Sequence, residues 1–375
     1  MSEKKQPIDS QVHLEVEPEI NRYFKAAIKA QASDLHLKVG HSLKLRVNKD
    51  IKDTTAEVMT EERIEKLVFE ILNDKQKQFL LENGSLDFAY EISQSDRFRV
   101  NVFRQRSKIS LSARRIVSAI PPFESLHLPP AIETIADKSH EGLILVGGPG
   151  GCGKSTTIAS MINHINNTRP CHIITIEDPL EFIYVDKKAI VSQREIGLDV
   201  RDYEDALKSL KRQDPDVVLI GELQEKETVT AAIRAAETGK LVFGTLNAAN
   251  GIQAIQRLID LFPQEERSLV RQTLANVLRA VISQMLLSGS KKTTPRVPAV
   301  EILIATPVVR NLIADGHENE VSGIIKTGES DGMLDFIESL RGLVEGDWID
   351  LKTALQYAPN VEELKMALKG IRSRG

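Results

Sequence analysis

Residues 147–156 read GGPGGCGKST and directly follow the apolar run LILV at 143–146. A short, continuously apolar run is typical of a strand buried in a parallel sheet. From Lys154 onward the apolar residues recur at helical spacing, at Ile158, Met161, Ile162 and Ile165. The flanks therefore place the glycines between a strand and a helix, which argues against a merely flexible turn.

The stretch matches the phosphate-loop pattern G-x-x-x-x-G-K-[ST] at Gly148, Gly153, Lys154 and Ser155. In this pattern backbone N–H groups surround the phosphates, and the positive end of the helix dipole adds to the attraction. Lys154 would reach the outer phosphates, and the Ser155 hydroxyl can bind Mg²⁺. We expect ATP to bind at Gly148, Pro149, Gly150, Gly151, Cys152, Gly153, Lys154, Ser155 and Thr156.

Composition indicates an ordinary globular protein of 375 residues, long enough for two domains. No apolar run approaches the roughly 18 residues of a membrane span, and the polar start MSEKKQPIDSQ does not resemble a signal peptide. Two cysteines cannot form a disulfide framework. We therefore expect a cytoplasmic protein. A net charge of −4 gives no overall footprint for nucleic acid, although a local basic patch stays open.

The first part of the chain predicts a small α+β domain over residues 19–117, after a flexible N-terminus at 1–18. Helical spacing in EINRYFKAAIKAQ and in TEERIEKLVFEIL, with Thr60 as N-cap, predicts two helices, and a further helix ends near Gly84. Five segments have the alternation of strands, namely DLHLKV, LKLRV, LDFAYEI, RFRVNVF and KISLSARRI. The proline-rich SAIPPFESLHLPP predicts a linker over 118–132.

The second part predicts an α/β domain over residues 133–306. The apolar strands LILVGG, HIITIED, VVLIGE and LVFGTL alternate with helical stretches, which is typical of a mostly parallel sheet covered by helices. Beyond about residue 262 we expect helices, apart from a hairpin in SGSKKTTPRVPAVEILIA, and then a helical C-terminal region at 307–375.

Ligands of open parallel sheets bind beyond the carboxyl ends of the strands, so polar residues directly after strands are the candidates. Glu177 and Asp178 follow one strand, Glu222 follows another, and Asn247 follows a third. An ATPase needs a carboxylate that activates the attacking water, and Glu222 is our candidate. Glu177 would help to polarise the water, or either carboxylate would hold Mg²⁺ through water together with Ser155. The alternative is that each carboxylate only caps the next helix.

The motifs GGPGGCGKSTT, IITIEDPLEF, SQREIG, RQDPDVVLIGE, AAETGKLVFGTL and LIDLFP occur in this order. Together they resemble the type II/IV secretion ATPase superfamily, and within it the PilT-like pilus retraction ATPases. ASDLHL, RFRVNVF and ATPVVRNLI extend the resemblance over nearly the whole chain. It implies a PAS-like N-terminal domain and a RecA-like ATPase domain. It also implies a hexameric ring that hydrolyses ATP to drive type IV pilus disassembly and twitching motility, docked on an inner-membrane platform protein.

The resemblance also implies roles for particular residues. Walker A falls on Gly148–Ser155, the Asp box contains Glu177, and Walker B ends with Glu222. Arginines of the N-terminal domain reach the nucleotide in this family, and by motif they fall on Arg99 and Arg114, with Arg104 a weaker candidate. Arginine can donate two N–H bonds to phosphate oxygens. The alternative for each arginine is a solvated basic strand face.

The chain departs from the family pattern at its His box. Lys240 in ETGK and Asn247 in TLNA stand where the family usually has histidines, and GELQE replaces the common GEMRD. We expect Asn247 to sense the γ-phosphate, because an amide can donate to a phosphate oxygen or accept from water. Pilus assembly relatives usually carry a four-cysteine zinc site, which two cysteines cannot build, so retraction is favoured.

Three hypotheses for the function follow. The first is a working retraction motor, with a paralogous ATPase as a further partner. The second is a weakly active accessory or regulatory paralogue of such a motor, which the altered His box favours. The third, a RecA-type ATPase that acts on DNA, is disfavoured by the acidic charge balance, and no nucleic-acid partner is expected.

Overall fold

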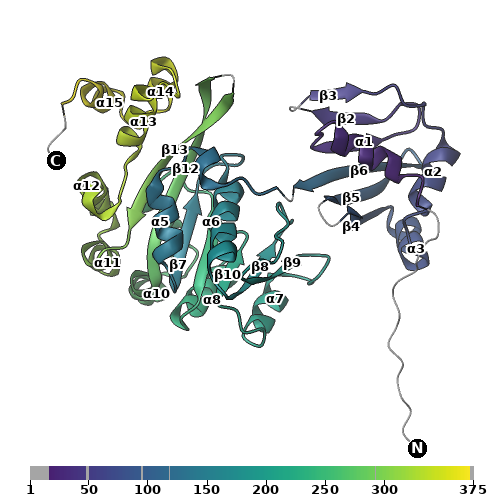
Figure 1. Ribbon diagram of the computed structural model, residues 1–375. Helices are drawn as coiled ribbons and strands as arrows, with labels where there is room; N and C mark the ends of the chain where they lie inside the picture. Colours follow the sequence, from purple (N-terminus) through teal and green to yellow (C-terminus); the bar gives the residue numbers. More distant parts are fainter. Residues whose placement is uncertain (1–16, 48–49, 94–95, 118, 292, 372–375) are drawn as a thin grey trace, which may run out of the picture. The chain divides into compact units, whose positions relative to one another are not determined.

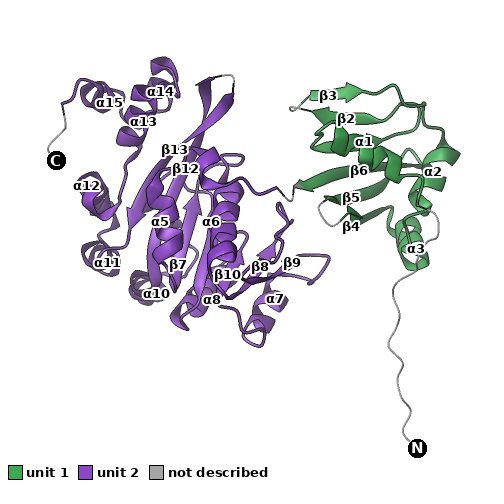
Figure 2. Cartoon of the chain, viewed as in Figure 1, with its two compact units in different colours: residues 1–117 green, residues 118–375 purple. Residues whose placement is uncertain are grey.

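The computed structural model describes residues 17–47, 50–93, 96–117, 119–291 and 293–371. It divides the chain into two compact units, residues 1–117 and 118–375 (Figure 2). The flexible N-terminus expected at 1–18 lies outside the described residues, apart from 17–18. No helix in the described part is both long enough and apolar enough to cross a membrane.

Unit 1 is a six-stranded antiparallel sheet with three helices. The strand order is β3-β2-β1-β6-β5-β4, with bounds β1 (Asp34–Leu37), β2 (Lys44–Val47), β3 (Asp50–Asp53), β4 (Ser85–Ser93), β5 (Asp96–Gln105) and β6 (Lys108–Val117). The helices are α1 (Asn21–Lys29), α2 (Glu61–Phe69) and α3 (Asp74–Asn83). Alternate residues of β5, Phe98, Val100 and Val102, are buried, so one face of the sheet forms the core and the other stays polar.

Local signals for unit 1 are confirmed. The Thr60 side chain accepts a hydrogen bond from the Arg63 N–H and begins α2, and Gly84 ends α3 with φ +76°. The strand β3 was not predicted, because all four of its residues are exposed and no apolar alternation marks it.

Unit 2 is built on a seven-stranded sheet with the order β13-β12-β7-β11-β10-β8-β9. The bounds are β7 (Gly142–Gly147), β8 (His172–Glu177), β9 (Ile190–Glu195), β10 (Val217–Ile220), β11 (Leu241–Leu246), β12 (Leu278–Lys291) and β13 (Thr294–Ile304). Every neighbouring pair runs parallel except β12 and β13. The predicted parallel sheet is therefore confirmed.

Helices cover both faces of this sheet. Ile144 and Val146 of β7 pack with α5 (Pro130–Lys138) and α6 (Lys154–Thr168), which lie on one face in Figure 1. Leu143 and Leu145 pack into the opposite core with α7 (Tyr203–Leu210), α8 (Lys226–Glu237), α9 (Gly251–Asp260) and α10 (Gln264–Val277). Burial on both faces explains why these strands are continuously apolar.

The expectation of helix beyond residue 262 is wrong for residues 278–287. They form the first part of β12, which lies between β7 and β13. An apolar run such as AVISQMLL, buried on both sides, has no periodicity that separates a strand from a buried helix. The helices that follow are α11 (Pro307–Ala314), α12 (Val321–Thr327), α13 (Phe336–Glu345), α14 (Leu351–Tyr357) and α15 (Val361–Leu368).

Part of the segment predicted as a linker is structured and packs within unit 2. It contains α4 (Phe123–Leu126) and the first residues of α5. The Ser160 hydroxyl of α6 donates to the Pro121 carbonyl at 2.7 Å, and Phe123 and Leu128 pack on the core around α6. This segment therefore helps to form unit 2.

Candidate active site

A cavity of about 630 Å³ lies beyond the carboxyl ends of β7, β11, β10 and β8. The glycine loop, Glu177, Glu222 and Asn247 all line it. Because parallel strands end at the same edge of the sheet, residues from four separate parts of the chain meet there. The cavity thus brings together the candidates from unit 2.

The loop backbone depends on its glycines. Gly148, Gly151 and Gly153 have φ values of +147°, +74° and +97°, a region that residues with a Cβ rarely adopt. A Cβ on Gly153 would also lie 2.7 Å from Gln284 Nε2. The N-cap residue of α6 is Gly153, which has no side chain that could cap the first turn, so the N–H groups of this turn can bind an anion.

Lys154 and Glu222 are linked through Asn247. Lys154 Nζ donates to the carbonyls of Gly148 at 2.7 Å and Pro149 at 3.2 Å, and to Asn247 Oδ1 at 3.2 Å. Asn247 Nδ2 donates to Glu222 Oε1 at 3.3 Å, and the Gln224 amide donates to the same oxygen. A single amide therefore contacts both the lysine expected to bind phosphate and the candidate base.

Ser155 contacts a carboxylate that sequence reasoning missed. Its hydroxyl donates to Glu181 Oε1 at 2.7 Å, and Glu181 also lines the cavity. Glu181 is the second glutamate of EDPLEF, so the Asp-box motif could have pointed to it. It lies in a loop, however, where periodicity gives no direction for the side chain.

Glu177 lies deeper than Glu181. Only 9% of its surface is exposed, and desolvation raises the pKa of its carboxyl to about 7, with a further contribution from the charge of Glu181. Its Oε1 has no hydrogen-bond partner among the described residues. Glu177 is thus mostly protonated in mildly acidic solution, when an exposed carboxylate is ionised.

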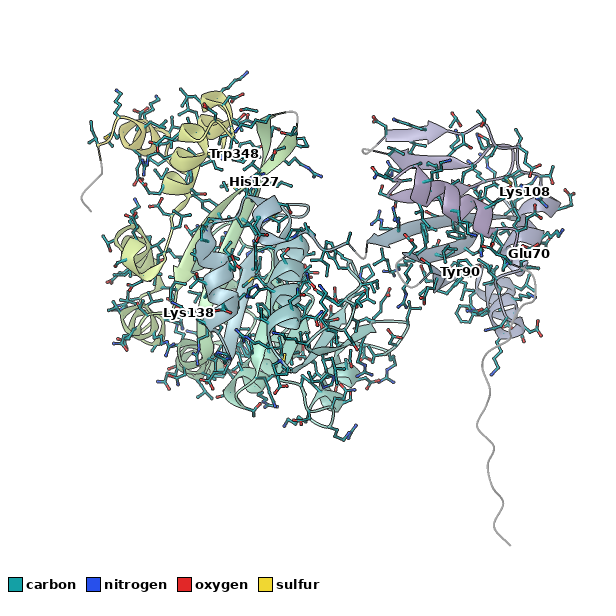
Figure 3. The ribbon with its side chains drawn as sticks, viewed as in Figure 1. Glu70, Tyr90, Lys108, His127, Lys138 and Trp348 are labelled. Carbon is teal, nitrogen blue, oxygen red and sulfur yellow. The ribbon has the colours of Figure 1, made fainter. Side chains whose placement is uncertain are left out.

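The cavity lining also includes apolar side chains. Among them are Leu126, Leu128, Leu286 and Pro298, of which Leu286 and Pro298 are opposite each other on β12 and β13. His127, between Leu126 and Leu128 in the chain, contacts Trp348, with ring centroids 4.2 Å apart and ring planes tilted by 43° (both residues are labelled in Figure 3). Lys291 Nζ lies 3.7 Å from the centre of the same indole ring.

The three candidate arginines belong to unit 1. Arg99 and Arg114 are directly opposite each other on β5 and β6, so they share one face of the sheet. Arg114 Nε donates to Asp34 Oδ1 at 2.9 Å. Arg104 is exposed near the end of β5, and because side chains alternate along a strand it lies on the opposite face of the sheet from Arg99. The contact of these arginines with nucleotide stays a prediction.

Comparison with known proteins agrees with the motifs. The family described as type II/IV secretion system protein matches residues 9–311. The type IV pilus retraction ATPase PilT of Pseudomonas aeruginosa is 39% identical over 91% of this chain and 98% of its own length. A twitching motility protein of Neisseria gonorrhoeae is 40% identical over 85% of each chain.

The fold is also shared. A crystal structure of the pilus retraction motor PilT with bound ADP superposes with a TM-score of 0.84, covering 93% of this chain and 99% of the other at 39% identity. The predicted fold class and the resemblance to pilus retraction ATPases are confirmed. The chain therefore belongs to the type II/IV secretion system protein family.

Proposed function

We propose that this chain is an ATP-hydrolysing motor of the pilus retraction type that works as a hexameric ring. The proposal rests on one observation: the glycine loop lines a cavity that also contains Lys154, Ser155, Glu222 and Asn247. The similarity to PilT over most of both chains supports the direction of the work, which is pilus disassembly and twitching motility.

In this proposal the loop N–H groups and Lys154 bind the phosphates of ATP. Apolar lining residues such as Leu126 and Leu286 suit a nucleotide base. Glu222 accepts the proton of the attacking water, and the amides of Asn247 and Gln224 hold its carboxylate toward the cavity. To reach the γ-phosphate, Lys154 exchanges its carbonyl partners for phosphate oxygens.

Mg²⁺ is the expected metal. The Ser155 hydroxyl and the Glu181 carboxylate, 2.7 Å apart, are the hard oxygen donors that this ion prefers, with Glu222 or Glu177 acting through water. When bound, Mg²⁺ neutralises charge on the phosphates during hydrolysis. Among the described residues no cluster of three metal-binding side chains occurs, so the proposed site relies on phosphate and water ligands as well.

Steady-state ATPase activity of the purified protein tests the proposal. Glu222→Gln should keep ATP bound but slow turnover strongly, because the amide preserves shape and cannot accept a proton. Lys154→Ala should weaken ATP binding and abolish turnover. Glu227→Gln, on an exposed position of α8, is the control and should resemble the parent. Parental turnover by Glu222→Gln would remove Glu222 from the mechanism.

The second candidate function is a weakly active accessory paralogue, and Asn247 is the observation that favours it. If a histidine here supplies a charge-assisted hydrogen bond in the transition state, its loss costs on the order of 1–3 kcal/mol, or about tenfold or more in rate. We expect Asn247→His, alone or with Lys240→His, to raise kcat. If neither variant exceeds the parent, the altered His box does not limit the rate.

The proposed partners are an inner-membrane pilus platform protein and a paralogous ATPase. In this proposal the protein acts in the cytoplasm, at the inner membrane, where it docks on the pilus machine. A DNA-acting ATPase is the disfavoured alternative. Salt-dependent DNA binding by the purified protein would favour that alternative over the motor.

A further inference from the structure

Gln284 packs against the phosphate loop, which consists of residues 148–155, and is itself among the residues that line the cavity. It belongs to β12, and the preceding residue, Ser283, pairs with Gly147 at the end of β7. The Gln284 side chain is buried, with 3% of its surface exposed. A buried amide in an apolar sheet needs partners for both of its polar ends.

Both ends of the Gln284 amide are paired with the loop or with the helix that follows it. Nε2 donates to the Cys152 carbonyl at 2.6 Å, and Oε1 accepts from the Thr157 hydroxyl at 2.8 Å. A carbonyl can only accept, so the NH₂ group must face Cys152. Oε1 must then face Thr157, whose hydroxyl is left to donate.

The hydrogen bond to Cys152 orients a donor. In a trans peptide unit the C=O and the next N–H point in opposite directions. Because the Cys152 carbonyl points at Gln284, the Gly153 N–H points away from it. Gly153 lines the cavity, where loop N–H groups are the expected phosphate donors.

The loop packs closely against both the backbone and the side chain of Gln284. A Cβ on Gly153 would lie 2.7 Å from Gln284 Nε2, and a Cβ on Gly148 would collide with the Gln284 carbonyl and the Cys152 sulfur. Two glycines of the motif are thus needed for packing against β12 as well as for backbone conformation.

We infer that Gln284 is a positioning residue that holds the phosphate loop in its nucleotide-binding conformation, while Thr157 fixes the orientation of the Gln284 amide. The inference rests on the proposed ATPase function. It predicts that loss of this amide weakens nucleotide binding more than it changes the chemical step, because the loop N–H groups are no longer held in place.

The test compares the ATP affinity, kcat, KM and melting temperature of four variants with those of the parent. Gln284→Met keeps the volume and removes both hydrogen bonds, and we expect ATP affinity to fall about tenfold, with KM rising more than kcat falls. Thr157→Val should weaken binding about threefold, and Thr157→Ser, which keeps the hydroxyl, should restore it. Once Gln284→Met is present, Thr157→Val should add little, because both act on one contact.

The matched control is Ser339→Ala. The Ser339 hydroxyl accepts a buried hydrogen bond from the Val300 N–H at 3.0 Å, and Ser339 is not among the described residues that line the cavity. This variant should lower the melting temperature and leave ATP affinity unchanged. If Gln284 only stabilised the fold, Gln284→Met would likewise lower the melting temperature and leave ATP affinity unchanged. An ATP affinity of Gln284→Met within twofold of the parent would therefore overturn the inference.

Two outcomes keep the inference apart from the proposed function. If the parent binds no ATP, the proposed function fails, and the inference fails with it. If the parent binds ATP but Gln284→Met does not fold, Thr157→Val and Thr157→Ser test the inference instead. Equal ATP affinity in these two variants and the parent would overturn the inference and leave the proposed function standing.

Discussion

Among the described carboxylates that line the cavity, Glu177 alone is buried. Its pKa is raised from 4.5 to about 7 because water is excluded from it. Between pH 4.5 and about pH 7 the Glu177 carboxyl is ionised in the unfolded chain but protonated in the folded chain, so the folded state binds more protons. The contribution of Glu177 to the free energy of unfolding is therefore fully present below pH 4.5 and is lost as the pH rises through about 7.

Glu177→Gln should remove this pH dependence. The shift corresponds to on the order of 3 kcal/mol in the free energy of unfolding. The stability advantage of the variant over the parent should therefore grow by about that amount as the pH rises from ~4.5 to ~8. Urea unfolding across this range measures the difference. Glu227→Gln, at an exposed carboxylate of α8, is the control. A constant difference between Glu177→Gln and the parent at all pH values would contradict the raised pKa.

Single residues of the site could be predicted where two signals coincide. Lys154 and Ser155 stand in a dense motif, and Glu222 and Asn247 follow apolar strands whose ends must meet. Gln284 gave no such signal, because it lies 132 residues from Cys152 in a strand that was predicted to be a helix. Its role depends on a strand order that periodicity cannot supply.

The segment 125–128 connects the cavity with the C-terminal region. Ser125, Leu126 and Leu128 line the cavity, and the ring of His127 between them contacts the ring of Trp348, which follows α13. His127 has φ +55°, a conformation that non-glycine residues rarely adopt without local support. Movement of this segment on nucleotide binding would therefore change the surroundings of the Trp348 indole.

Trp348 is the single tryptophan of the chain, so tryptophan fluorescence reports on the surroundings of this one indole. We expect ATP to change the intensity or the wavelength of the emission, and His127→Ala to reduce the change while the protein still binds ATP in calorimetry. Lys138→Ala, on an exposed residue of α5, is the control. If ATP binds to the parent without any change in emission, the segment does not move relative to Trp348.

The elements of the sheet were predictable to different degrees. The strands β7, β8, β10 and β11 are short apolar runs followed by turn or loop residues, so their type is clear. The edge strand β9 has a mixed pattern, and β12 continues almost directly from α10, without glycine or proline between them. Without such a break, the change from helix to strand is decided by tertiary packing.

Two units with separate cores make up the molecule, and we propose that arginines of unit 1 assist the chemistry of unit 2. Unit 2 holds the phosphate loop and Glu222, whereas Arg99 and Arg114 lie on the polar face of the unit 1 sheet. In ring ATPases such arginines are often supplied by the neighbouring subunit. A hexameric motor of the proposed kind would then have sites that one chain cannot complete.

Mixed rings test this directly. Rings made only of Arg114→Ala or only of Glu222→Gln should have almost no ATPase activity. Arg104→Ala, on the other face of the sheet, should lose less activity. If Arg114 acts across the subunit boundary, some sites in an equal mixture combine an intact Glu222 with an intact Arg114 from the neighbour. With random exchange about a quarter of the sites are complete, so activity should recover to about a quarter of the parental value. Within one subunit every site would carry a lesion, and a mixture no more active than its components would show that Arg114 does not act in trans.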